Sequence, residues 1–250
     1  MARFFVSPGQ IGPAKISIFD GDVNHIRRVL RMKEGDELTV CDGEGRDYFC
    51  RISSMSDDVV TCDIIDSWTS YVELPVRLHL FQGLPKADKM ELIIQKAVEL
   101  GAAEIIPVAM ARSIVKLDEK KAGKKTSRWQ GIAESGAKQS GRAIVPEVRQ
   151  PMSYKQALSY ASSLDAVIVP YEKAEGIEQS RALIDELASD ENIKSIGIFI
   201  GPEGGFDAAE VQLAKQYGAA PATLGPRILR TETAPLAALS VLMYITGNMQ

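Results

Sequence analysis

The spacing of hydrophobic residues divides the chain into two parts with different rhythms. Up to about residue 74, short runs alternate apolar with polar residues, as at 37–41 and 48–52, and turn residues separate the runs. This alternation predicts β-strands, and Asp42-Gly43-Glu44-Gly45 predicts a hairpin between two of them. Only the stretch from His25 to Arg31 has helical spacing. The pattern predicts a small β-barrel or sandwich.

From residue 75 onward, apolar runs alternate with stretches of helical spacing. The expected strands are 76–84, 104–110, 165–170, 195–200 and 222–224, and the expected helices are 88–100, one around 129–139, 177–188, 207–217 and 233–245. Strands that alternate with helices of this length predict an α/β domain with a largely parallel sheet. Asp88 with Glu91, and Asp207 with Glu210, predict capping boxes at two helix starts. The linker is expected near Trp68–Pro75.

The composition is that of an ordinary globular protein, with 45% hydrophobic and 25% charged residues. No apolar run approaches the roughly 18 residues of a membrane-spanning helix, and no secretory signal is recognisable, so we expect a cytoplasmic protein. Cys41, Cys50 and Cys62 lack C-x-x-C spacing, and the chain has two histidines. Neither a metal site nor a Ser-His-Asp triad is therefore expected.

The net charge of −4 does not by itself indicate nucleic-acid binding. Lysine and arginine outnumber aspartate and glutamate only in the middle third of the chain, and that excess lies between Arg112 and Arg149. A local basic patch can attract a polyanion even on an acidic protein. On composition alone, a solvated Lys-rich helix explains the same pattern.

A glycine-rich loop follows the expected strand 195–200. The segment from Ile198 to Asp207 reads as a buried strand, the sequence Gly-Pro-Glu-Gly-Gly, and a helix start. Glycines let the backbone approach a ligand closely, and ligands of open α/β sheets lie beyond the carboxyl ends of strands. The sequence is neither a G-x-G-x-x-G fingerprint nor a Walker loop. A tight turn without a ligand is the alternative.

A second unusual segment runs from Leu224 to Pro235. Its Gly-Pro pair interrupts regular structure, and polar residues precede the almost entirely apolar helix 236–245. Such a helix belongs to a core or to an oligomer interface. Arg230 and Glu232 form either part of a site or a simple ion pair in a loop.

The two loops together, G-P-E-G-G and L-G-P-R-I-L-R-T-E-T-A, resemble those of the SPOUT superfamily of RNA methyltransferases. More closely, the whole chain resembles the bacterial family that methylates N3 of a uridine in small-subunit (16S) ribosomal RNA. Further matches are Arg3–Val6, His25–Arg31, Lys86–Glu91, Lys96–Gly101 and Gln139–Arg142. Family members commonly have Thr at the position of Val98 and alanines at those of Ser135-Gly136, which lie outside the two loops.

The resemblance implies a two-domain fold. Residues 1–72 look like a PUA-like β-barrel that binds RNA. Residues 73–250 look like the SPOUT methyltransferase domain, an α/β domain with a mostly parallel sheet and a C-terminal trefoil knot, a feature that nothing in the periodicity predicts. The superfamily also implies a homodimer.

The implied cofactor is S-adenosylmethionine, bent into a pocket between the knot's loops, and no metal is implied. The matching residues are Val169, Pro170, Gly201, Pro202, Glu203, Gly204, Leu224, Gly225, Ile228, Leu229 and Thr231. Methyl transfer to uridine N3 needs alignment and stabilisation of the ring's negative charge after the N3 proton is lost. Arg230 is the expected stabilising cation, and Glu232 is either the proton acceptor or the partner of Arg230.

The implied partner is small-subunit ribosomal RNA, free or in the assembled small subunit. The expected RNA contacts are Arg3, His25, Arg28, Arg31, Arg112 and Arg142. Three other functions remain open: a SPOUT enzyme acting on another RNA position, a non-catalytic RNA-binding protein, and a nucleotide-binding α/β enzyme. The intact second loop disfavours the non-catalytic protein, and the missing phosphate-loop lysine disfavours the nucleotide-binding enzyme.

Overall fold

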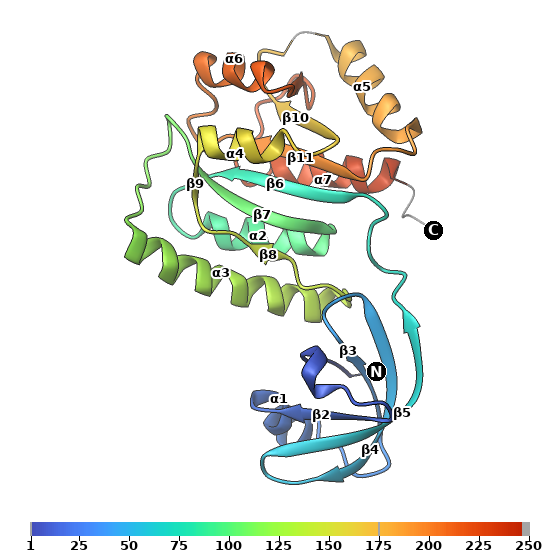
Figure 1. Cartoon of the computed structure of the whole chain (residues 1–250). Helices are drawn as coiled ribbons and strands as arrows, with labels where there is room; N and C mark the ends of the chain where they lie inside the picture. The colour runs from blue at the N-terminus through green and yellow to red at the C-terminus, as the bar shows by residue number, and fades with distance from the viewer. Residues whose placement is uncertain (1, 175, 247–250) are drawn as a thin grey trace. The chain divides into compact units, whose positions relative to one another are not determined.

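The computed structural model describes residues 2–174 and 176–246, and the chain forms two compact units (Figure 1). The first unit comprises Met1–Glu73 and Ala137–Val145, and the second comprises Leu74–Gly136 and Pro146–Gln250. The division after Glu73 lies within the expected linker. The return of the chain to the first unit at Ala137, within helix α3 (Glu119–Ser140), was not predicted.

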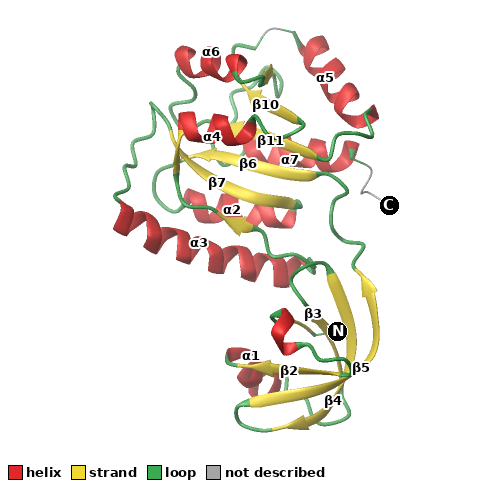
Figure 2. Cartoon of the chain, viewed as in Figure 1, coloured by secondary structure: helices red, strands yellow, loops and turns green. Residues whose placement is uncertain are grey.

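The first unit is built on a curled five-stranded sheet (Figure 2). Its strands are β1 (Arg3–Phe5), β2 (Lys15–Phe19), β3 (Glu37–Cys41), β4 (Arg46–Met55) and β5 (Val59–Thr69), in the order β1-β3-β4-β5-β2. Neighbours pair antiparallel, except that β1 pairs parallel with β3. Because β1 and β2 form the two edges, the sheet is an open half-barrel rather than a closed barrel, and it curls around a core that includes Ile16, Leu38 and Val60.

The expected helix at His25–Arg31 has an unusual geometry. A short helix α1 (Gly21–Asn24) continues into a π-helix, η2 (His25–Val29); a 3₁₀ turn, η1 (Pro8–Gln10), lies earlier. The wider π turn changes the phase of the side chains, so Ile26 is fully buried, whereas Val29 is 68% and Leu30 40% exposed. The apolar spacing therefore did not identify a buried face.

The second unit is an α/β domain with a parallel sheet (Figure 1). Its strands are β6 (Arg77–Gly83), β7 (Ala102–Ala109), β8 (Glu147–Val148), β9 (Met152–Ser153), β10 (Ala166–Pro170), β11 (Ser195–Ile200) and β12 (Ala220–Ala222). Their order is β12-β10-β11-β6-β7-β8, with β9 also on β7, and every pairing is parallel. The predicted mixed α/β class is confirmed, while the trefoil knot stays a prediction.

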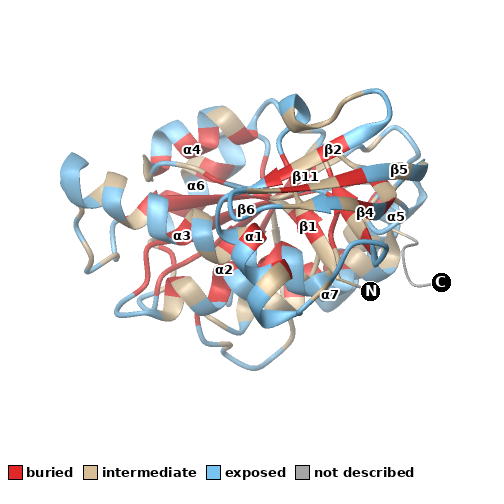
Figure 3. Cartoon of the chain, turned by 90° about the horizontal axis from the view of Figure 1, so that it is seen from below, coloured by how far each residue is buried: buried red, intermediate tan, exposed pale blue. Residues whose placement is uncertain are grey.

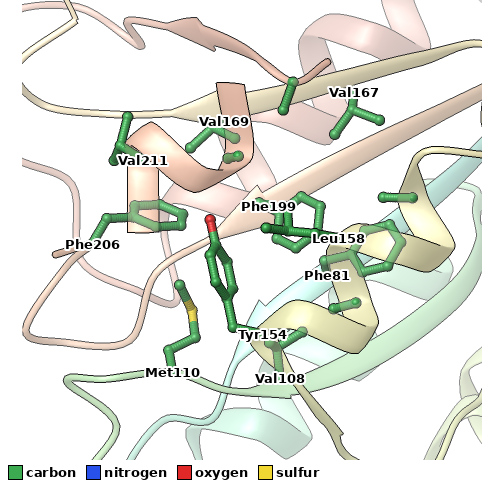
Figure 4. Close-up of a cluster of buried hydrophobic side chains, with 14 of the residues drawn as sticks. Phe81, Val108, Met110, Tyr154, Leu158, Val167, Val169, Phe199, Phe206 and Val211 are labelled. Carbon is green, nitrogen blue, oxygen red and sulfur yellow. The ribbon is translucent and has the colours of Figure 1, made fainter. Parts of the chain in front are cut away.

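Helices cover both faces of this sheet. They are α2 (Lys89–Glu99), α3, α4 (Tyr154–Ala161), α5 (Ile177–Ser189), α6 (Ala208–Gln216) and α7 (Ala234–Ile245). On the face covered by α4 and α6, Phe81 and Phe199 stack with ring centroids 4.4 Å apart, and Tyr154 packs edge-on against Phe199 (Figure 4). Helices α2 and α7 contact each other and strands β6, β7 and β11. Buried residues follow the strands and the inner helix faces (Figure 3).

Most predicted elements of this unit are present, and the errors have physical reasons. Helix α3 is longer than predicted because its first half is polar and lacks an apolar stripe, and α4 was not predicted. Asp207 and Glu210 form the expected capping box, whereas the side chain of Asp88 caps nothing. None of the helices in the described residues is long and apolar enough to cross a membrane.

Candidate active site

The strand order of the second unit reverses between β6 and β11. From β6 the chain proceeds to β7 and β8 on one side, whereas β11, β10 and β12 lie on the other. In open parallel sheets, ligands bind beyond the carboxyl ends of the strands at such a reversal. A cavity of about 390 Å³ lies there, and the segments after β10, β11 and β12 line it together with Lys89 at the start of α2.

The structure brings the predicted cofactor loops together around this cavity. The predicted residues that line it are Pro170, Gly201, Pro202, Glu203, Gly204, Leu224, Gly225, Ile228, Leu229, Arg230 and Thr231. Val169 is fully buried in the core cluster behind Pro170, so it supports the wall from inside. The cavity therefore assembles three loops that are far apart in the sequence.

The glycine-rich loop after β11 packs too tightly for side chains. A Cβ atom on Gly201 would lie 3.1 Å from the carbonyl carbon of Gly205 and 3.3 Å from the ring of Phe206. A Cβ on Gly83, at the end of β6, would lie 2.7 Å from the backbone nitrogen of Pro202. Because backbone atoms cannot yield as a flexible side chain can, the path of this loop requires glycine at Gly83 and strongly favours it at Gly201.

Thr231 joins the second loop to the first. Its side chain is buried, and its hydroxyl donates to the carbonyl oxygen of Gly201 at 2.7 Å and accepts from Nε2 of Gln82 at 3.1 Å. Gln82 lies on β6 and is also buried. Since both partners are fixed within the sheet or its edge, Thr231 fixes the start of α7 against the cavity floor.

Arg230 is one of two exposed arginines that line the cavity, the other being Arg227. The guanidinium of Arg230 forms no hydrogen bond or ion pair with any residue that the structure describes. Ile228 is 82% exposed on the same loop. An arginine without a protein partner beside a cavity is available to an anionic or carbonyl-bearing ligand.

Glu232 does not pair with Arg230, which corrects one of the two roles expected for it. Its Oε2 lies 3.0 Å from the ammonium of Lys89, and Oε1 of Glu203 lies 3.4 Å from the same ammonium. The ion pair with Lys89 is the main cause that lowers the pKa of Glu232, and Glu232 in turn raises the pKa of Lys89. Lys89 is a site residue that the sequence reasoning missed, although the matching segment 86–91 contains it.

Arg112 supports the glycine-rich loop. Its guanidinium donates to the carbonyl oxygen of Gly204 at 3.1 Å and pairs with Asp207 at 3.2 Å. A Cβ on Gly204 would lie 2.9 Å from the Cβ of Arg112, so the glycine-rich loop and the segment around Arg112 are in close contact. Arg112 was expected to contact RNA, and half of its side chain remains exposed beside this structural role.

The predicted RNA contacts of the first unit fall into two groups. Arg142 is buried against the carboxylate of Glu73, and Arg3 is largely buried and pairs with Asp47 at 2.6 Å. Arg142 is thus a structural residue rather than a surface contact, because its charge is already neutralised away from solvent. His25, Arg28 and Arg31 are exposed, and they lie together on and just after the π-helix.

A parallel sheet with a loop-built cavity at its strand reversal is the architecture of a ligand-binding α/β domain. Residues 72–243 match the family model described as RNA methyltransferase domain, and residues 15–65 match that described as RNA methyltransferase PUA domain. The chain belongs to this RNA methyltransferase family, which confirms the predicted family and the enzyme class.

Relatives resemble the chain over nearly its whole length. It is 43% identical to ribosomal RNA small subunit methyltransferase E of Bacillus subtilis, over 98% of this chain and 97% of that protein. A ribosomal RNA small subunit methyltransferase E from Neisseria gonorrhoeae bound to S-adenosyl methionine is 33% identical, with a TM-score of 0.81 over 98% and 97% of the two chains. A protein from Legionella pneumophila whose structure holds the bound cofactor SAM is 32% identical, with a TM-score of 0.82 over 97% of this chain and 96% of that chain.

Proposed function

We propose that this protein transfers a methyl group from S-adenosylmethionine to N3 of a uridine in small-subunit ribosomal RNA. The observation that carries the proposal is the cavity at the strand reversal, where three loops expected to bind the cofactor meet beside Arg230, which has no ion-pair partner among the described residues. The two similar proteins whose structures contain the cofactor support the ligand. The name of the Bacillus subtilis relative supports the RNA substrate.

The residues around the cavity fit the cofactor by their chemistry. Leu224, Ile228 and Leu229 offer apolar surface for an adenine, and the glycine-rich loop offers backbone groups at close approach. When bound, the cofactor supplies an electrophilic methyl group on a sulfonium, which needs no metal. The protein's tasks are therefore to hold this group and the uracil in line and to exclude alternative geometries.

Arg230 acts on the uracil. Uridine N3 carries a proton at neutral pH, so the reactive form is the minority anion that remains after this proton has passed to water. A permanently charged guanidinium with two parallel donors favours that anion and orients the ring. Because the pKa of Glu232 is lowered, Glu232 is a weak base, and we assign it a role in holding Lys89 rather than in accepting the N3 proton.

Two further features complete the proposal. His25, Arg28 and Arg31 form the RNA-contacting surface of the first unit, which would then be an RNA-binding domain. The protein is a homodimer through α7, whose Val241 and Tyr244 are 43% and 67% exposed although the helix is apolar all round. Sedimentation at micromolar concentration should give a dimer, and an active monomer would contradict this part.

The test of the function is methyl transfer itself. Purified small ribosomal subunits and free small-subunit RNA are incubated with the protein and tritiated S-adenosylmethionine, and the RNA is digested to nucleosides. We expect label in 3-methyluridine alone. Label in a 2′-O-methylated or carbon-methylated nucleoside would assign the enzyme to another RNA position. Binding of RNA without any transfer would favour a non-catalytic RNA-binding protein.

A further inference from the structure

The turn between β6 and α2 enters the candidate active site with a strained backbone. Ala87 has a φ of 52°, in the left-handed region that alanine rarely occupies. The neighbouring Lys86 donates its backbone N–H to Oε1 of Glu203 at 3.0 Å. Strain of this kind persists only where the surrounding contacts hold it, and it often occurs at functional sites. The turn thereby delivers Lys89 to the edge of the cavity.

Lys89 contacts both cofactor loops at once. Glu203 lies in the loop after β11, and Glu232 lies in the segment before α7, 3.4 Å and 3.0 Å from the ammonium of Lys89. All three side chains are partly shielded, with exposed fractions of 34% for Lys89, 27% for Glu203 and 18% for Glu232. Without the cation, two carboxylates would face each other across the cavity wall and repel.

The same contact decides what Arg230 can do. Arg230 stands two positions before Glu232, and its charge already contributes to lowering the pKa of that carboxylate. If Lys89 did not neutralise Glu232, Arg230 would be the remaining cation whose charge acts on that carboxylate. The ammonium of Lys89 therefore keeps the guanidinium free for a ligand.

We propose that Lys89 is a positioning residue with two effects: it holds the two cofactor loops together, and it keeps Glu232 from capturing Arg230. This inference rests on the proposed function, because the second effect is measured as a change in the rate of methyl transfer. The first effect is measured by the affinity for the cofactor alone.

The test uses the full chain with Lys89→Met, which keeps the length of the side chain and removes its charge. Lys96→Met is the matched control, since Lys96 lies on the same helix and pairs with Glu99 at 2.8 Å away from the cavity. Calorimetry without RNA should show S-adenosylmethionine bound roughly 5-fold more weakly by Lys89→Met, the upper end of what a partly exposed ion pair contributes. Lys89→Arg should bind nearly normally, and so should Lys96→Met.

The double variant Lys89→Met with Glu232→Gln separates positioning from general damage. At saturating cofactor and RNA, Lys89→Met should transfer methyl slowly because Arg230 is drawn to Glu232. Neutralising Glu232 should release Arg230, so the double variant should be faster than Lys89→Met alone. If both substitutions were merely structural lesions, their losses of rate would add, or the second substitution would leave the rate of Lys89→Met unchanged.

The pH profile of cofactor binding gives an independent reading. The groups around Glu232 are Lys89, Arg230 and Glu203. Since Lys89 is the main cause that lowers the pKa of Glu232, its loss should raise that pKa and move the acid limb of binding to higher pH. An unchanged acid limb would count against the ion pair.

Two outcomes would overturn the inference: cofactor affinity of Lys89→Met within twofold of the wild type, or a double variant no faster than the single one. If Lys89→Met fails to fold, Glu203→Gln applies the binding test, because it removes one of the two anchors and keeps the cation. A wild-type protein that binds the cofactor but methylates another position would refute the proposed function and leave the loop-holding effect testable by calorimetry.

Discussion

Two clusters of charged side chains lie at opposite ends of β6. They contain similar residues but have different roles. Beyond its carboxyl end, Lys89 joins Glu203 and Glu232 beside the cavity. Near its amino end, His79 contacts Glu104 of β7, and this carboxylate receives two more donors. The first cluster is open to a ligand, whereas the second is closed within the protein.

The closed cluster satisfies Glu104 completely. Its Oε2 accepts from Tyr160 at 2.6 Å and lies 2.8 Å from Nδ1 of His79, while Arg149 binds its Oε1. Burial alone would raise the pKa of Glu104, but these hydrogen bonds outweigh it and lower the pKa to about 2. The comparison shows that shifted carboxylates do not identify a site by themselves. Access to a cavity distinguishes function from stability.

The largest expected effect is on stability, in the closed cluster. Glu104→Gln should lower the free energy of unfolding by about 3–5 kcal/mol, because Tyr160, His79 and Arg149 lose a charged hydrogen-bond acceptor and each such bond contributes about 1.5–3 kcal/mol. Urea denaturation measures this loss. The control is Glu147→Gln, because Glu147 pairs with the same Arg149 but is exposed and lies 3.5 Å from it. This substitution should change stability little. A Glu104→Gln protein as stable as the wild type would remove the contrast between the clusters.

In the open site, Arg230→Ala should affect rate rather than stability. Loss of one preorganised donor to a developing anion typically slows an enzyme by about 10²–10³-fold. The affinity for S-adenosylmethionine should be nearly normal and RNA binding somewhat weaker, while Arg230→Lys should recover part of the rate because it keeps the charge without the planar fork. Single-turnover transfer at saturating RNA is the measurement. A wild-type rate would make Arg230 structural and place the stabilising group elsewhere.

The closed cluster also predicts how stability depends on pH. The pKa of Glu104 is about 2 in the folded protein and 4.5 ordinarily, so its contribution is present above the unfolded value. That contribution, about 3 kcal/mol from the difference in pKa, is lost as pH falls from about 4.5 toward 2. Urea midpoints measured over this range should fall steeply for the wild type and less for Glu104→Gln. Parallel curves would show that other carboxylates dominate.

The sequence predicted the open site better than the closed cluster. Glycines and prolines directly after apolar strands are local signals, so the loops at 201–204 and 224–231 could be recognised. Lys89 could not, because its role depends on β6 lying next to β11, a pairing between strands far apart in the sequence.

The same limit explains why Arg142 is buried against expectation and why the carboxylate partner of Arg3 was not foreseen. Arg142 binds Glu73, and Arg3 binds Asp47. In each pair the two residues are far apart in the sequence, so only the folded structure shows that they meet. From the sequence alone such an arginine is therefore expected to be an exposed surface charge. His25, Arg28 and Arg31 are local to one segment, and they remain exposed. The family resemblance gave the two-domain organisation that periodicity only outlined.

The smallest expected effect tests whether exposed arginines of the first unit act on RNA. Each phosphate contact adds roughly 0.7–0.9 to the slope of log affinity against log salt. Changing Arg28 and Arg31 to Ala should therefore flatten that slope by about 1.4–1.8, with cofactor binding intact. Arg46 and Arg51 provide the control, because Arg46 binds Ser67 and Arg51 pairs with Glu37 on the sheet. Their replacement by Ala should leave the slope unchanged. If both double variants shift the slope equally, RNA is attracted by the overall charge of the first unit rather than by particular arginines. If neither does, Arg28 and Arg31 belong to a solvated surface like any other, and RNA affinity resides in the second unit.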